Sequence, residues 1–133
     1  MTRRAIPGAL LAALMAATAR ADPPPGVLDL LRAAAEALAD KDSAAFLDLF
    51  DRAMPGYTEL RDNIEALLAA DDVASTIEIA NDEGTEQARE MELDWLLQIS
   101  HNPPRRAVLK CRVERKGRSW KITGLEPIAF FRR

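Results

Sequence analysis

Three residues whose side chains could do chemistry occur once each in the chain: Tyr57, His101 and Cys111. No second cysteine or histidine accompanies them, so neither a zinc site nor a cysteine–histidine nucleophile is expected. Cys111 lies in an alternating apolar segment, where a lone cysteine is typically a small buried hydrophobe; a reactive thiol is the alternative. His101, before two prolines, is expected in a solvated turn. Tyr57 is expected over a helix junction, with a hydroxyl-donor role as its alternative. The sequence therefore predicts no catalytic residue, no metal and no cofactor.

Charge and composition narrow the classes of partner. The chain has 133 residues, and its 48% hydrophobic and 29% charged residues are ordinary for a soluble domain. The formal net charge is −3, and the first 21 residues carry three arginines, so the remainder is close to −6. Such a domain repels phosphate groups. We therefore expect neither nucleic acid nor an anionic membrane surface as a partner.

Residues 1–21 have the order of a signal peptide: Arg3 and Arg4, an apolar run, and a small-x-small site ending at Ala21. The apolar run is too short to span a bilayer. The arginine pair leaves both the general secretory and the twin-arginine route open, and no cysteine follows for a lipid anchor. We expect a periplasmic or secreted bacterial protein that begins with a proline-rich extended segment, residues 22–26.

The mature chain divides into a helical half and a strand half. Apolar residues at helical spacing predict three helices, at 27–38, 43–53 and 58–70. Period-two alternation then predicts four strands, at 73–81, 86–100, 105–115 and 119–131, with a bend at Gly124 or Pro127. This order favours an α+β domain, residues 27–133, in which three helices pack on one face of a curved antiparallel sheet.

Charges on the outward positions predict how the second and third strands pair. The second strand is acidic outside and the third is basic, which would set Glu92 opposite Arg112 and Asp94 opposite Lys110. Leu96 and Val108 are apolar residues on that otherwise charged face. The outer face is therefore expected to be exposed to solvent, with a small apolar patch.

Three helices followed by a four-stranded meander resemble the nuclear transport factor 2-like superfamily, which includes the SnoaL-like domains. The likeness is carried by LADKD at 38–42 with FLDLF at 46–50, and by WKI at 120–122 with LEPI at 125–128. The resemblance implies a cone-shaped sheet with a pocket, and dimers through the sheet. It implies no activity, because the superfamily includes both enzymes and binding domains. Family members carry a short strand pair where this chain has only Met54–Tyr57, so a more open cone is expected.

The inward positions predict what the cone would bind. They are almost wholly apolar and contain no pair of ionisable groups, which favours non-catalytic binding of a small apolar ligand or of a protein partner. An isomerase or dehydratase acting in the cone is the alternative. A module that interacts through the outer sheet face, as a homodimer, is a third reading. Six residues are the candidates to line the pocket: Phe50, Tyr57, Met91, Trp95, Cys111 and Trp120.

Overall fold

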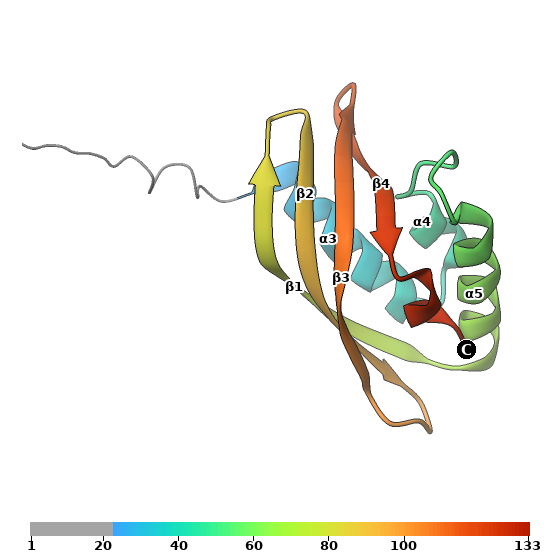
Figure 1. The fold of residues 1–133 in the computed structure, drawn as a ribbon. Helices are drawn as coiled ribbons and strands as arrows, with labels where there is room; N and C mark the ends of the chain where they lie inside the picture. Colours follow the sequence, from blue (N-terminus) through green and yellow to red (C-terminus); the bar gives the residue numbers. More distant parts are fainter. Residues whose placement is uncertain (1–22) are drawn as a thin grey trace, which may run out of the picture.

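The computed structural model describes residues 23–133, and the expected signal peptide, residues 1–21, lies outside them. Three helices come first, followed by four strands and a terminal 3-10 helix (Figure 1). The helices are α3 (Pro25–Ala39), α4 (Ser43–Leu47) and α5 (Tyr57–Ala70). The strands are β1 (Val73–Gly84), β2 (Ala88–Ile99), β3 (Arg105–Lys116) and β4 (Ser119–Glu126), and the 3-10 helix is η1 (Ile128–Phe131).

The strands form one antiparallel sheet in sequence order, with α3 packed across one face and α5 packed against α4 and η1 (Figure 1). We call the face under α3 the covered face and the opposite one the open face. Every second residue of β2 from Met91 to Ile99 lies on the covered face and is buried. The predicted α+β class, with helices on one face of a curved four-stranded sheet, is confirmed.

The first two helices differ from the prediction at their ends. α3 begins at Pro25, where the fixed φ of proline suits the first helical turn, rather than at Val27. The second helix stops at Leu47 instead of reaching residue 53. It stops because Phe50 forms a parallel bridge with Ile122 of β4, and a helical backbone has no group free for that bond.

The register between β2 and β3 is two residues away from the prediction. Glu92 lies opposite Lys110, and Glu90 lies opposite Arg112. Asp94 lies opposite Val108 and instead pairs diagonally with Arg106, whose Nη2 is 2.6 Å from Asp94 Oδ2. The predicted pairs were wrong because a charge pattern with period two fits equally well after a shift of two. For the same reason every side chain kept its predicted face.

Two bulges shape the sheet. In β1 the pairing slips between Ile79 and Asn81, which leaves Ala80 unpaired and lets the strand run on to Gly84. In β4 it slips at Thr123, beside the expected bend at Gly124. β4 then ends at Glu126, so the predicted extension of the strand to Phe131 was wrong: the chain turns at Pro127 into η1. This turn sends Phe130 and Phe131 into the core.

Candidate functional site

The cone interior is filled by the protein's own aromatic rings. Phe131 meets Trp95 edge-on with ring centroids 5.1 Å apart, and Phe130 meets it at 6.5 Å. Trp95, Phe131 and Phe46 have no exposed surface, so no space large enough for a water molecule touches them. η1 thus occupies the place where the resemblance implied a ligand pocket.

The structure places the six predicted pocket residues around this filled interior. Five are buried, and Tyr57 is partly buried against the core. Met91 and Cys111 also border a hollow on the open face, whereas the other four do not. Binding of a ligand by the six residues stays a prediction.

The single cysteine and histidine take the environments expected of them. Cys111 is buried, and burial raises the pKa of its thiol to about 12. At neutral pH the group is therefore a protonated thiol, a poor nucleophile. His101 is exposed in the loop between β2 and β3. Among residues 23–133, no cluster of three histidine, cysteine or acidic side chains is placed to hold a metal ion.

An ion pair that sequence reasoning missed lies on the covered face. Arg89 Nε and Nη2 donate to Asp82 Oδ1 and Oδ2 at 2.8 and 3.0 Å, and only 13% and 11% of the two side chains are exposed. Arg89 also donates to the carbonyl of Thr85. Asp82 faces inward because the bulge at Ala80 reverses the alternation of β1 beyond it. In the sequence, a bulge would be visible only as one extra residue in the alternation before Asp82. That residue is equally consistent with the start of a turn.

A second arginine on the covered face holds the C-terminus. Arg105 Nη1 donates to the carbonyls of Phe130 and Arg132, both at 2.6 Å. These bonds tie η1 to the start of β3, far from it in sequence. The covered face is thus held by apolar contacts at its centre and by the hydrogen bonds of Arg89 and Arg105 at its ends.

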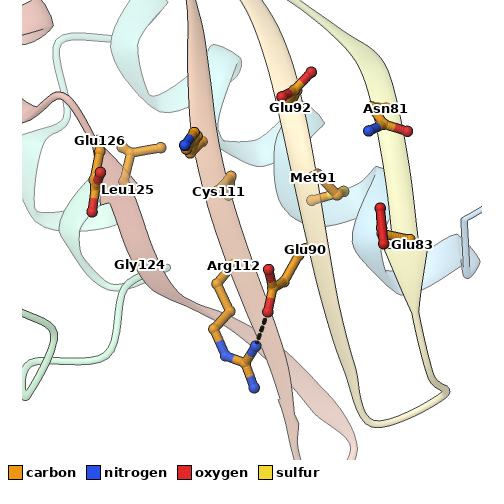
Figure 2. A pocket seen from close by; sticks show the side chains of 11 residues that line it. Asn81, Glu83, Glu90, Met91, Glu92, Cys111, Arg112, Gly124, Leu125 and Glu126 are labelled. Atoms are coloured by element: carbon orange, nitrogen blue, oxygen red, sulfur yellow. Dashed lines mark hydrogen bonds and ion pairs between the residues drawn. The ribbon is translucent and has the colours of Figure 1, made fainter.

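The open face carries a hollow of about 450 Å³ over the middle of the sheet (Figure 2). Its floor is the backbone of β2, β3 and β4, since Met91, Cys111 and Leu125 turn their side chains to the covered face. Its walls carry four carboxylates and two cations. These are Glu83, Glu90, Glu92, Glu126, Lys110 and Arg112.

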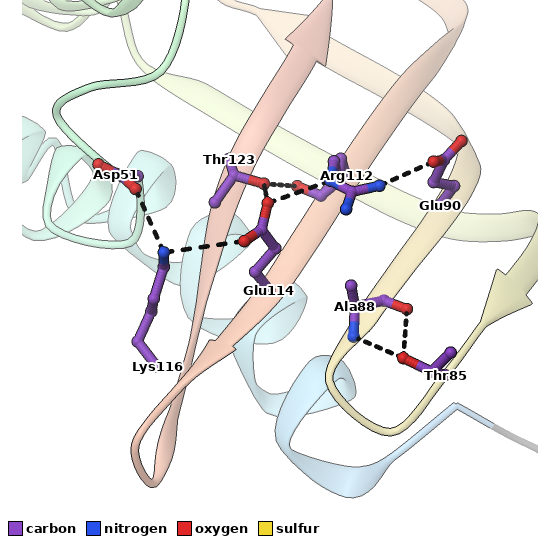
Figure 3. Close-up of polar contacts among 8 residues, drawn as sticks. All are labelled: Asp51, Thr85, Ala88, Glu90, Arg112, Glu114, Lys116 and Thr123. Atoms are coloured by element: carbon purple, nitrogen blue, oxygen red, sulfur yellow. Dashed lines mark hydrogen bonds and ion pairs between the residues drawn. The ribbon is translucent and has the colours of Figure 1, made fainter.

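A network of polar side chains runs from this hollow toward β4 (Figure 3). Arg112 Nη1 donates to Glu90 Oε2 at 2.7 Å, and its Nε donates to Glu114 Oε2 at 3.1 Å. Thr123 Oγ1 in the β4 bulge donates to the same Glu114 oxygen at 3.1 Å. The hydrogen bonds from Arg112 and then Thr123 lower the pKa of Glu114 below its usual value.

Further along, Lys116 Nζ lies 3.7 Å from Glu114 Oε1 and 3.8 Å from Asp51 Oδ2, so the network reaches the loop after α4 (Figure 3). At the other end of the face, the hydrogen bond from Arg106 lowers the pKa of Asp94. Beside that pair lies Val108, 56% exposed. Charged groups held in place around an apolar residue suit binding rather than proton transfer.

Within the part of the chain that the structure describes, no helix has the length and apolar character needed to cross a membrane.

Comparison with known proteins supports the fold alone. No family model and no curated protein matches the chain. An NTF-2-like protein of unknown function from Shewanella oneidensis is 16% identical, with a TM-score of 0.63 over 75% of this chain and 93% of that one. A protein of unknown function with a cystatin-like fold from Nostoc punctiforme is 18% identical, with a TM-score of 0.60 over 75% and 85%.

The protein Bd1075 of Bdellovibrio bacteriovorus is 11% identical, with a TM-score of 0.65 over 75% of this chain, which spans 39% of the length of that one. Identities this low show a shared architecture and no shared activity. The chain has the nuclear transport factor 2-like fold, in its α+β, cone-shaped form.

Proposed function

We propose that this chain is an exported, non-catalytic binding domain whose partner docks on the open face of the sheet. The filled interior is the observation that carries the proposal. Trp95 has no exposed surface, and its neighbours Phe130 and Phe131 are anchored by Arg105. Of the two ligand classes expected from the sequence, a protein partner is the one that this geometry supports.

A second copy of the chain fits the open face. Consider a two-fold axis that runs along the strands, between β2 and β3 of two sheets packed face to face. It sets the acidic β2 of each copy over the basic β3 of the other. Glu92 and Lys110 lie opposite each other within one copy, and neither forms an ion pair with another described residue. The same axis would pair each Glu92 with the partner copy's lysine and set each Val108 over the partner copy's Asp94, diagonally across from the other Val108.

Sedimentation equilibrium tests this assembly, with two matched substitutions. Val108 and Leu28 are the large apolar residues most exposed in the described chain, at 56% and 40%, on opposite sides of the molecule. We expect a dimer for the native chain, a monomer for Val108→Asp, whose carboxylate would face the partner copy's Asp94, and a dimer for Leu28→Asp. A native monomer at millimolar concentration, or a monomer for Leu28→Asp alone, would remove the open face as the dimer interface.

Export rests on residues 1–21 of the sequence. If the segment is cleaved after Ala21, the mature protein begins at Asp22. Intact-mass measurement of protein recovered from the periplasm or medium would show that start. Recovery of the full-length mass from the cytoplasm only would contradict export.

An enzyme in the cone is the weaker candidate. Among the described residues, Asp82 is the least exposed carboxylate on the covered face. Both of its oxygens already accept hydrogen bonds from Arg89. While these bonds hold, neither oxygen is free to accept a proton from a bound molecule.

A further inference from the structure

The two edges of the sheet are treated differently by the fold. The edge of β4 is paired: Asp51 donates from its backbone nitrogen to the carbonyl of Ile122 at 2.8 Å, and Ile122 donates to that of Leu49 at 2.9 Å. The outer edge of β1 pairs with no strand of the described residues (Figure 1). An edge of this kind presents a row of backbone donors and acceptors to any extended chain.

The edge of β1 lacks the residues that usually prevent pairing. Residues 73–79 contain neither proline nor lysine, and their side chains alternate regularly. Natural sheets commonly block an exposed edge with one of these residues or with a bulge. Here the bulge at Ala80 and the inward-facing charge of Asp82 both lie beyond the regular stretch, in which Glu78 is the one charged residue. A strand of about seven residues could therefore pair without obstruction.

Apolar surface continues to this edge on the covered side. Ile77 and Ile79 are only partly buried, although Trp95 and Leu93, their partners on β2, have no exposed surface. A further strand beside β1 would cover both isoleucines. Its residues on that side should accordingly be apolar.

Charge indicates which residues an added strand would carry on the open face. Every charged residue between Arg61 and Arg89 is acidic. On the open face, Glu78 lies directly opposite Asp94, and Glu83 lies directly opposite Glu90. Asp94 and Glu90 already pair with Arg106 and Arg112 of β3, whereas Glu78 and Glu83 form no ion pair with another described residue. A cation on a strand added beside β1 would pair with these two carboxylates.

We propose that the free edge of β1 binds, by strand addition, an extended segment of a partner protein in which apolar residues alternate with lysine or arginine. The apolar side chains lie beside Ile77 and Ile79, and the basic side chains lie beside Glu78. This site is independent of the proposed dimer, which uses the open face and leaves the edge unpaired.

The probe is a peptide of about eight residues that alternates valine with lysine. One matched peptide carries glutamate in place of lysine, and another has its central amides N-methylated, which keeps the charges but removes the backbone donors. Isothermal titration calorimetry with the mature protein gives the affinities, and amide chemical shifts locate the site. We expect the lysine peptide to bind roughly ten-fold more tightly than either control, with shifts concentrated in residues 73–80.

Three substitutions separate edge pairing from general attraction to negative charge. Thr76→Lys places a cation on the edge and should weaken binding roughly ten-fold. Glu78→Gln should weaken it by about three-fold, whereas Glu65→Gln, the same change on the exposed side of α5, should not alter it. Circular dichroism and the unfolding midpoint verify that each variant is folded.

Two results would overturn the proposal. One is equal binding by the N-methylated peptide, with shifts at Glu90, Glu92 and Glu126, which would mark ionic attraction to the open face. The other is no binding of the lysine peptide to the folded native protein at millimolar concentration.

Discussion

The two faces of the sheet are built from the same strands but differ in burial and charge. On the covered face, Leu93, Trp95 and Leu97 have no exposed surface and are packed beneath helices or η1. On the open face, Asp94 and Arg106 are held by a bidentate hydrogen bond beside the exposed Val108. The first face stabilises the fold, because apolar area leaves water there, and the second face, where charged groups are ordered without being buried, is the one that we propose for binding. The following experiments test this division, beginning with the largest expected effect.

Removing the central ring of the covered face should cost the most. We expect Trp95→Ala to lower the free energy of unfolding by about 3–5 kcal/mol, because it leaves a cavity beside Phe130 and Phe131. Val108→Ala on the open face should change it by less than about 0.5 kcal/mol. Urea unfolding measures both, and similar losses for the two variants would abolish the distinction between the faces.

The ion pairs of the two faces should differ next. Asp82→Ala leaves Arg89 unpaired at a site where its side chain is 13% exposed, and we expect a loss of about 2–3 kcal/mol. Glu90→Ala breaks an exposed pair with Arg112 and should cost less than about 0.5 kcal/mol. A double-mutant cycle with each arginine checks the coupling. Equal coupling energies would show that burial does not set the strength of these pairs.

The thiol of the covered face should make stability fall at high pH. Burial raises the pKa of Cys111 from 9.0 to about 12, so above pH 9 the unfolded chain loses a proton that the folded chain keeps. Stability should therefore decrease between about pH 9 and 11, by up to about 1.4 kcal/mol per pH unit. Urea unfolding across this range should give a shallower decrease for Cys111→Ala. Identical slopes, or rapid labelling of the native thiol at pH 8, would contradict its burial.

The smallest effect is expected on the open face, in a pKa rather than in stability. The hydrogen bond from Arg106 lowers the pKa of Asp94, so Arg106→Ala should raise that pKa toward its ordinary value. Because the folded pKa is the lower one, the associated stability is present above the ordinary pKa and is lost as pH falls. Carboxyl carbon shifts in an NMR titration report the change. Arg106→Lys, which keeps the charge without the planar pair of donors, should give an intermediate value, and an unmoved pKa in both variants would refute the assignment.

The sequence was a reliable guide wherever burial alone determines a pattern. Strand β2 was recognised because Met91, Leu93 and Trp95 alternate with charged residues, and a helix would scatter those charges around its surface. The contrast between a buried and a charged face followed from the same alternation. The candidate site was foreseen in part: the charged open face and Val108 were expected, but the position of each ion pair was not, since charge patterns tolerate a shift of two residues.

What the amino-acid order determined by itself is the set of helices and strands and the side of each that avoids water, because neighbouring residues suffice to define that preference. Tertiary structure alone decided that the second helix ends early to bond Ile122, that the bulge at Ala80 turns Asp82 inward, and that η1 fills the cone. Each of these outcomes depends on a backbone or aromatic partner distant in the chain. Competition between non-local contacts decides such outcomes, and the local spacing of residues therefore does not predict them.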